Sequence, residues 1–220
     1  MKKHFEVLRR CPLFDGIHNE ELLSMLGCLQ AKVTQFDKKY TIFSEGSPAK
    51  FIGIVLSGKA QIEQVDFYGN RSILAVAEPG ELFAEAFACA QVQALPVSAV
   101  ATEPSEIMLI DCARILHTCP NGCGFHQQMI FNLMKNLAAK NLQFHQKIEV
   151  LAKRTTRDKL LTYLAYQAKK AQCSEFTIPF DRQGLADYLE VDRSGLSAEI
   201  GKLRRERILD CHKNRFRLLT

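Results

Sequence analysis

A stretch near the end of the chain, residues 181–209, has the pattern of two short helices joined by a tight turn. Asp181 and Asp192 each stand where a carboxylate can cap a helix, because it accepts hydrogen bonds from the free N–H groups of the following turn. Apolar residues recur with helical spacing on both sides of the turn: Leu185, Ala186 and Leu189, then Leu196, Ile200 and Leu203. The pattern predicts two amphipathic helices that pack against each other.

The outer face of the second of these helices carries short polar and basic side chains. Arg193 stands at its start, followed by Ser194, Ser197, Ala198 and Lys202. Short side chains allow a helix to enter the major groove of DNA, where base edges are read, and basic residues at its ends can contact phosphates. The pattern predicts a DNA-binding helix-turn-helix, with an ordinary amphipathic helix pair as the alternative.

Positive charge is concentrated in the same part of the chain. Residues 152–220 hold 15 of the 29 Lys and Arg residues but only 9 of the 24 Asp and Glu residues, a net charge of +6. The remaining residues hold 14 against 15, so their net charge is −1. A basic domain attached to a nearly neutral one is typical of a protein that contacts phosphates with one domain.

The residues that flank the helix pair predict a small sheet. A helix (155–171) and a strand (175–180) precede the pair, and the chain ends in a hairpin whose turn falls at Lys213. A helix pair completed by such a hairpin predicts a winged helix-turn-helix, which we assign to residues 153–220. Its further candidate DNA contacts are Arg182, Lys213 and Arg215.

The first half of the chain has a different composition. Residues 4–30 predict two short helices, and residues 31–111 contain short runs rich in Val, Ile and Phe separated by Gly and Pro. Turn signals at residues 57–58 and 79–80 divide these runs into the strands of an antiparallel barrel or roll. The predicted fold class is therefore α+β, with an effector-sensing antiparallel β-roll domain in residues 1–122.

A long helix is predicted from about residue 124, within a segment, residues 123–152, that separates the two domains. Apolar residues recur there in alternating steps of four and three, which is the heptad repeat of a coiled coil. One central position holds Asn, which sets the register and partner number of two-stranded coiled coils. The segment predicts a homodimer with interface residues Ile130, Met134, Leu137, Asn141, Phe144 and Ile148. A helix buried in its own core is the alternative.

Other features restrict the class of protein. No apolar run reaches the roughly 18 residues that a membrane helix needs, and the N-terminus lacks the apolar core of a secretory signal, so we expect a cytoplasmic protein without a membrane partner. Eight cysteines in that compartment argue against a disulfide framework, and their spacing predicts no metal site. No nucleophile elbow, phosphate-binding loop, zinc-protease motif or dinucleotide motif occurs, so we expect no enzyme.

Four sequence motifs, which occur in the same order as the predicted domains, resemble those of a known family. They are residues 8–14, Pro79-Gly80-Glu81-Leu82, residues 185–189 and residues 192–203. The chain resembles the Crp/Fnr family of bacterial transcription regulators over essentially its full length. The resemblance implies a dimer that binds double-stranded DNA at a two-fold site, with RNA polymerase as a further partner. The family usually has Glu and Arg where this chain has Ser194 and Ala198, so its base preferences should differ.

The predicted roll departs from family members that bind cyclic nucleotides. In those members a Gly-Glu-Leu turn and a later arginine hold the ribose and phosphate; here the turn stands at 80–82, but the arginine position falls at Leu95. No Lys, Arg or His occurs between Arg71 and Arg114, and burying a phosphodiester without a cation is costly. We therefore expect a small apolar effector other than a cyclic nucleotide, or a packed core with none. The candidate pocket residues are Glu81, Leu82, Phe83, Phe87, Cys89, Leu95 and Val97.

Haem and thiol chemistry remain alternatives for the signal, because histidines and cysteines occur in this half of the chain. The candidates are His117 and His126 for haem, and Cys119 with Cys123 or Cys11 with Cys89 for thiols. Surface or core positions are the plain alternative for each of these residues. The cofactor therefore stays unassigned, and a ligand-binding module that does not bind DNA is the remaining alternative function.

Overall fold

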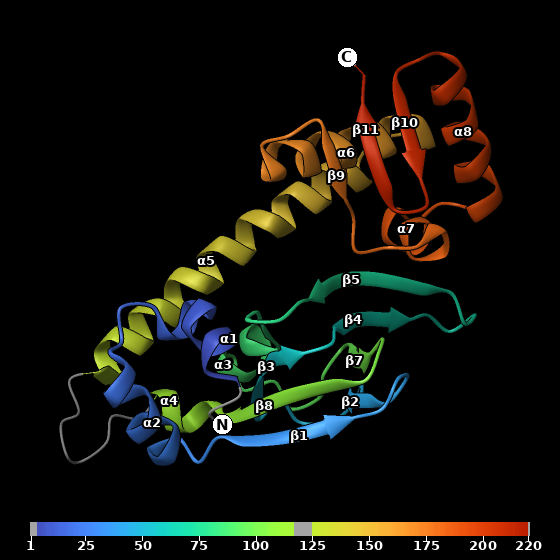
Figure 1. The fold of residues 1–220 in the computed structure, drawn as a ribbon. Helices are drawn as coiled ribbons and strands as arrows, with labels where there is room; N and C mark the ends of the chain where they lie inside the picture. The colour runs from blue at the N-terminus through green and yellow to red at the C-terminus, as the bar shows by residue number, and fades with distance from the viewer. Residues whose placement is uncertain (1–3, 117–124, 220) are drawn as a thin grey trace. The chain divides into compact units, whose positions relative to one another are not determined.

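The computed structural model describes residues 4–116 and 125–219 (Figure 1). The chain divides into two compact units, Met1–Gly69 with Leu74–Lys140, and Asn70–Ile73 with Asn141–Thr220. The first unit contains a β-roll and the second a three-helix domain with a small sheet, so the predicted α+β class is confirmed.

Two four-stranded antiparallel sheets make the roll, with strand orders β1-β8-β3-β6 and β2-β7-β4-β5. The strands are β1 (Lys32–Phe36), β2 (Thr41–Phe43), β3 (Phe51–Ser57), β4 (Ala60–Val65), β5 (Arg71–Ala77), β6 (Leu82–Phe83), β7 (Ser98–Ala101) and β8 (Ser105–Asp111). Gly58 turns the chain from β3 into β4 with a φ of 77°. A Cβ at this position would lie 2.2 Å from Ser105 Oγ, so the turn requires glycine.

The central strand β3 is buried on both of its faces. Val55 lies between the two sheets in a core that includes Phe83 and Ile107. Ile52 and Ile54 point to the opposite face, where they join a second core formed with the helices. The helices that contribute to this second core are α1 (Phe5–Arg10), η2 (Pro12–Phe14), α2 (Asn19–Cys28), α3 (Glu85–Cys89), α4 (Cys112–Leu116) and α5 (Phe125–Leu151). Double burial explains why β3 is a continuous apolar run.

The long helix α5 has the bounds that the heptad pattern predicts, and its first half packs on the roll. Met129 and Leu133 are fully buried there. The side-chain amide of Asn132 donates to the carbonyls of Leu13 (3.1 Å) and Asp15 (2.7 Å), which ties α5 to the N-terminal segment. Among the described helices, α5 included, none has the length and apolar character that a membrane span requires.

The second unit is a winged helix-turn-helix, as predicted. It consists of α6 (Thr156–Ala171), β9 (Glu175–Thr177), α7 (Arg182–Leu189), α8 (Arg193–Arg205), β10 (Leu209–His212) and β11 (Arg215–Leu218), with sheet order β10-β11-β9. Strand β9 is shorter than the predicted 175–180 because Pro179 lacks the N–H that a ladder needs.

Local sequence signals form the turn between α7 and α8. Asp181 Oδ1 accepts from the N–H of Gly184, and Asp192 Oδ2 accepts from the N–H of Gly195, each at 2.7 Å. Glu190, in the left-handed conformation with a φ of 52°, ends α7. The six apolar residues predicted to face each other are all buried: Leu185, Ala186, Leu189, Leu196, Ile200 and Leu203.

Candidate nucleic-acid interface and sensor domain

The exposed face of α8 is lined by small side chains. Ser194, Ser197 and Ala198 are exposed, and half-buried Gly201 continues the same face at helical spacing, so that it ends at exposed Arg205. A Cβ placed on Gly201 would meet no atom within 4 Å, which shows that the space above this residue is open. The exposed face of α8 therefore consists of small residues with an arginine at each end, Arg193 and Arg205.

The two serine hydroxyls on this face are held by local hydrogen bonds. Ser194 Oγ donates to Asp192 Oδ2, and Ser197 Oγ donates to the carbonyl of Arg193 at 2.9 Å. The pKa of Asp192 lies below its usual range because it accepts from the Ser194 hydroxyl and from the backbone N–H of Gly195. Each hydroxyl keeps a free lone pair, so both serines can still accept a hydrogen bond from a base.

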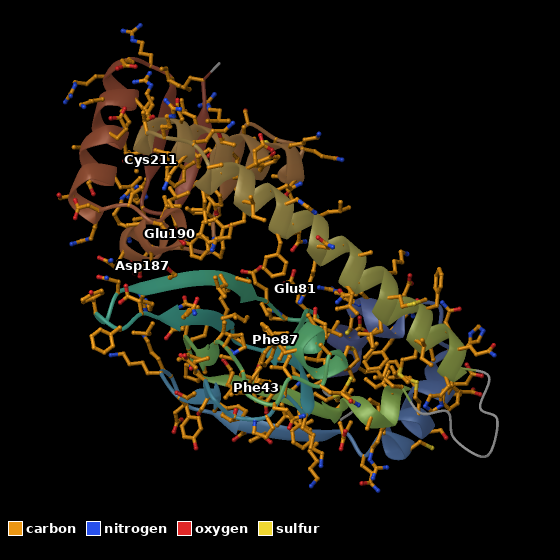
Figure 2. The ribbon with its side chains drawn as sticks, turned by 180° about the vertical axis from the view of Figure 1, so that it is seen from behind. Phe43, Glu81, Phe87, Asp187, Glu190 and Cys211 are labelled. Atoms are coloured by element: carbon orange, nitrogen blue, oxygen red, sulfur yellow. The ribbon has the colours of Figure 1, made fainter. Side chains whose placement is uncertain are left out.

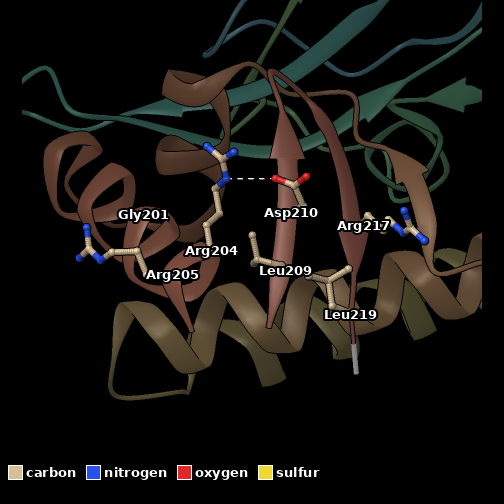
Figure 3. A pocket seen from close by; sticks show the side chains of 7 residues that line it. All are labelled: Gly201, Arg204, Arg205, Leu209, Asp210, Arg217 and Leu219. Atoms are coloured by element: carbon tan, nitrogen blue, oxygen red, sulfur yellow. Dashed lines mark hydrogen bonds and ion pairs between the residues drawn. The ribbon is translucent and has the colours of Figure 1, made fainter. Parts of the chain in front are cut away.

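A groove lies at the C-terminal end of this face, between α8 and the hairpin β10–β11 (Figure 3). It has a volume of about 430 Å³ and is lined by Gly201, Arg204, Arg205, Leu209, Asp210, Arg217 and Leu219. Arg204 Nε lies 3.1 Å from Asp210 Oδ1, the ion pair drawn in Figure 3. Within the described residues no salt bridge engages Arg205 or Arg217, so both guanidinium groups are available to an anion.

Sequence reasoning missed Gly201 in this face, and it considered Arg205 only as part of the basic run, residues 202–205, at the end of the helix. Both residues continue the spacing of Ser194, Ser197 and Ala198, so the signal that could have found them was the same helical periodicity carried one turn further. Strand alternation in the sequence places Arg217 on the same face of the last strand as Arg215, but Arg217 joins the groove only because β11 lies beside β10.

Of the other residues predicted to contact DNA, one is exposed, and three already contact another side chain of the protein. Lys213 is exposed at the hairpin turn, where its φ is 55°. Lys202 Nζ lies 3.4 Å from Glu199 Oε2, and Arg215 Nε lies 2.6 Å from Glu175 Oε1, so each of these cations has a carboxylate partner. Half-buried Arg182 lies over the ring of Phe216, with its Cζ 5.9 Å from the centroid.

Salt bridges hold α8 against α6. Arg157 of α6 lies 2.5 Å from Glu206 Oε2 and 3.4 Å from Glu199 Oε1. The hydrogen bond from Arg157 lowers the pKa of Glu206 below its usual range. These contacts fix the position of α8 from its inner side and leave its outer face free.

The roll has a small pocket with a volume of only about 10 Å³, which is room for about one water molecule. The cavity is lined by Phe43, Ile62, Ala84, Phe87, Leu95, Val97 and Ala99. Phe43 and Phe87 approach it from β2 and α3 (Figure 2). The predicted pocket residues Phe87, Leu95 and Val97 therefore come together, but their side chains already fill the space.

The other four predicted pocket residues do not line this cavity. Leu82 and Phe83 lie in the two apolar cores of the roll. The carboxylate of Glu81, which is exposed, accepts from the backbone N–H of Glu78 at 2.9 Å and so closes the turn around Gly80. Cys89 lies beside Cys112, with its Sγ 3.6 Å from the Sγ of Cys112.

A cation does reach the roll, although none occurs between Arg71 and Arg114. Lys140 Nζ, on α5, lies 2.6 Å from Glu85 Oε1 and donates to the carbonyl of Leu82. The side-chain amide of Asn136 donates to the same Glu85 oxygen at 3.1 Å. Helix α5 therefore brings a cation to the roll from a distant part of the sequence, and this charge is paired with Glu85.

The haem and thiol candidates fall in different surroundings. His117, Cys119 and Cys123 lie outside the described residues. The ring of His126 is buried, with Nε2 3.1 Å from the carbonyl of Arg114. Burial raises the pKa of the Cys11 thiol to about 12, which disfavours its thiolate form. Within the described ranges, no three His, Cys, Asp or Glu side chains gather as metal ligands would.

The predicted dimer residues of α5 also divide into two groups. Met134, Asn141, Phe144 and Ile148 are exposed, and the neighbouring apolar residues Phe131 and Leu142 are exposed with them. Leu137 packs against the core of its own chain, and Ile130 is half-buried. The apolar face that remains open is therefore centred on Met134, Asn141 and Ile148.

Residues 33–119 match the cyclic nucleotide-binding domain family. The chain is also 29% identical over 80 residues to the CRP-like cAMP-activated global transcriptional regulator of Mycobacterium tuberculosis. The aligned segment makes up 36% of this chain and 35% of the relative, so the chain spans about a third of the length of the curated relatives it matches. The activation by cAMP belongs to that relative.

Several solved structures have the same architecture. They include FixK2 from Bradyrhizobium japonicum (TM-score 0.69, 19% identity, 86% of this chain and 93% of that one). The c-di-GMP responsive global regulator CLP from Xanthomonas campestris has a TM-score of 0.73 and 16% identity, over 92% of this chain and all of the other. A CRP/FNR family regulator from Thermus thermophilus has a TM-score of 0.61 and 20% identity, over 86% and 94%. These matches confirm the predicted fold.

Proposed function

We propose that this chain, a Crp/Fnr family regulator by its relatives and its fold, is a homodimeric transcription factor that binds specific double-stranded DNA through α8. The observation that carries the proposal is the outer face of α8. Its small residues permit close approach to base edges, and Arg193 and Arg205 stand at its two ends. Arginines there suit a guanine edge or a phosphate.

The winged helix-turn-helix supplies further contacts of the same chemical kind. Exposed Lys213 at the hairpin turn suits a phosphate, and the groove with Arg205 and Arg217 adds positive charge beside α8. Arg182, Lys202 and Arg215 already have partners within the protein, so we assign them to the support of the interface rather than to direct base contacts.

Dimerisation through α5 completes the proposal. Met134, Phe144 and Ile148 are exposed on a helix whose other side is buried, and exposed apolar patches of this kind mark interaction surfaces. Asn141 would fix the register of the pair. Two α8 helices related by a two-fold axis would read half-sites about 34 Å apart. RNA polymerase is the partner that a regulator of transcription would meet on such DNA.

The proposal also includes the class of effector that controls the dimer. The cavity of about 10 Å³ among Phe43, Phe87 and Leu95 suits no nucleotide, and a small apolar effector would enter only by displacing these side chains. The positive charge of Lys140 does not favour a nucleotide ligand, because it is already paired with Glu85. We therefore retain an effector other than a cyclic nucleotide.

Selection from random double-stranded DNA followed by anisotropy titration tests the proposal. Wild-type protein should enrich a two-fold sequence, and the logarithm of its affinity should fall steeply with the logarithm of salt concentration. Arg193→Ala should weaken binding at least about tenfold, since one good base contact is worth roughly 1–3 kcal/mol.

Arg9→Ala is the matched control, because it also removes one exposed arginine but lies on α1 in the roll. Its affinity should equal that of the wild type. DNA binding that is weak, equal for all DNA sequences and insensitive to salt would contradict the proposal.

A further inference from the structure

Two cysteines from separate elements lie side by side in the roll. Cys89 ends α3, and Cys112 begins α4 directly after β8. Their Sγ atoms are 3.6 Å apart, whereas a disulfide requires about 2.05 Å, so a relative shift of roughly 1.5 Å would join them. The short helix α3 is the element that can shift most easily to do so, because it is little more than one turn long.

The two thiols have unequal surroundings. Cys89 is half-buried and Cys112 is buried. The hydrogen bond between them lowers the pKa of Cys89, although burial and Glu85 act in the opposite direction. The same hydrogen bond, with burial, raises the pKa of Cys112. Reaction with an oxidant requires a thiolate that solvent can reach, so Cys89 is the reactive sulfur and Cys112 the second one.

We propose that Cys89 and Cys112 form a reversible disulfide when the protein meets a hydroperoxide such as hydrogen peroxide. The Cys89 thiolate attacks one peroxide oxygen; an S–O bond forms, the O–O bond breaks, and the departing hydroxide takes a proton to become water. The Cys112 sulfur then attacks the Cys89 sulfenic acid; an S–S bond forms, the S–O bond breaks, and the second hydroxide leaves as water with the Cys112 proton. Two thiols lose two electrons, and the peroxide accepts them.

The helix α3 connects this pair to the rest of the sensor. Glu85, at its start, holds Lys140 and Asn136 of α5, and Phe87 lines the cavity. The residues just outside the helix, Ala84 and Gln91, have φ values of 63° and 53°, a conformation that costs residues other than glycine energy. A disulfide that pulls the end of α3 would therefore act on Glu85 and its contacts with the dimer helix.

Peptide mass mapping of the full-length protein tests the disulfide. Reduced protein is treated with hydrogen peroxide, the remaining thiols are alkylated, and the digest is analysed before and after reduction with dithiothreitol. We expect one cross-linked species that joins the peptides of Cys89 and Cys112 and disappears on reduction. Alkylation of both residues under conditions that oxidise exposed Cys28 or Cys173 would overturn the proposal.

Two variants separate the roles of the thiols. In Cys112→Ala, a sulfenic acid should accumulate on Cys89, where a cyclic diketone reagent can trap it; in Cys89→Ser, Cys112 should stay reduced. Cys28→Ser is the matched control, and it should form the cross-link as the wild type does. Equal peroxide reactivity of Cys89 and Cys112 would contradict the assignment, and the wild-type map remains decisive if Cys112→Ala fails to fold.

The effect on regulation rests on the proposed DNA binding and is measured separately. Oxidised and reduced wild type should differ in DNA affinity by at least about fivefold, the lower end of typical allosteric coupling, and Cys89→Ser should show no difference. A cross-link without any change in affinity would overturn the regulatory role. Absence of DNA binding in both states would instead contradict the proposed function and leave the disulfide standing.

Discussion

The two units each hold a conspicuous ion pair, and the surroundings of the two pairs differ. In the roll, Lys140 and Glu85 are 2.6 Å apart, and only 2% of the Glu85 side chain is exposed. In the winged helix-turn-helix, Arg204 and Asp210 are 3.1 Å apart with more than half of each side chain exposed. A buried carboxylate depends on its cation, whereas an exposed pair can exchange either partner for water.

The same contrast holds for the spaces in the two units. The pocket in the roll has a volume of about 10 Å³ and is lined by apolar side chains, and the groove beside α8 has about 430 Å³ with arginines at its rim. A ligand of the roll would have to displace side chains before it could enter this pocket. The other presents charge that a phosphate can reach directly. The following predictions test that difference.

Lys140→Met should have the largest effect, a loss of about 3–5 kcal/mol in the free energy of unfolding, because it leaves the Glu85 carboxylate buried without a cation. Chemical denaturation measures the loss. The double variant Lys140→Met with Glu85→Gln should recover most of it. Arg204→Met is the matched control, and it should cost no more than about 1 kcal/mol. Equal costs for the two single variants would remove the contrast between the units.

Leu95→Ala should lower the free energy of unfolding by about 2–5 kcal/mol, because Leu95 is 4% exposed and its truncation enlarges the pocket that it lines. The enlarged cavity should also bind a small apolar probe such as benzene, which thermal denaturation detects as a regain of stability. Leu219→Ala, at the open groove, should change stability by less than about 0.5 kcal/mol. A small cost for Leu95→Ala would mean that the roll is not packed as described.

Gly201→Glu should weaken DNA binding about tenfold or more, which corresponds to roughly 1.4 kcal/mol, because it places a carboxylate on the face that we propose binds DNA. Folding should be retained, since a side chain at Gly201 meets open space. Gly27→Glu is the matched control, because a Cβ at Gly27 also meets nothing within 4 Å and the residue lies on α2. Anisotropy titration that shows the same loss in both variants would remove Gly201 from the interface.

Loss of the salt bridge between Arg157 and Glu206 should lower the free energy of unfolding by the smallest amount, and this amount should depend on pH. The hydrogen bond from Arg157 lowers the pKa of Glu206, so the pair stabilises the fold above the usual glutamate pKa and is lost as pH falls through the lowered value. Urea denaturation should therefore show a constant difference between wild type and Arg157→Ala at about pH 5–7, and a shrinking one below about pH 4. Arg154→Ala, which removes a neighbouring exposed arginine, should show no such dependence.

Much of the winged helix-turn-helix was predictable because its signals are local. The caps Asp181 and Asp192, the apolar spacing of α7 and α8, and the turn at Lys213 all act within one or two turns of the chain. The exposure of Ser194 and Ala198 followed from the same periodicity. What could not be predicted was which basic residues would find a partner, because Lys202 and Arg215 are chemically equivalent in sequence to basic residues that stay free.

The roll was less predictable, because its contacts join residues that are far apart in the sequence. Its strands and its Gly80 turn could be placed, but Leu82 and Phe83 alternate toward two different cores, and only sheet pairing decides which core each one joins. Glu81 belongs to the same phrase, yet its carboxylate closes a turn. A motif of three neighbouring residues was thus assigned to one pocket, although strand alternation and the turn send its side chains to different places.

The α+β class, the winged helix-turn-helix with its exposed small-residue face, and the bounds of α5 follow from the amino-acid order alone, because periodicity and capping depend on near neighbours. Only packing in three dimensions brings Lys140 to Glu85, nearly fills the space among Phe87, Leu95 and Val97, and places Cys89 beside Cys112, 23 residues away. These contacts join separate elements, and the free energy that selects them is shared by the whole core rather than held in any one segment.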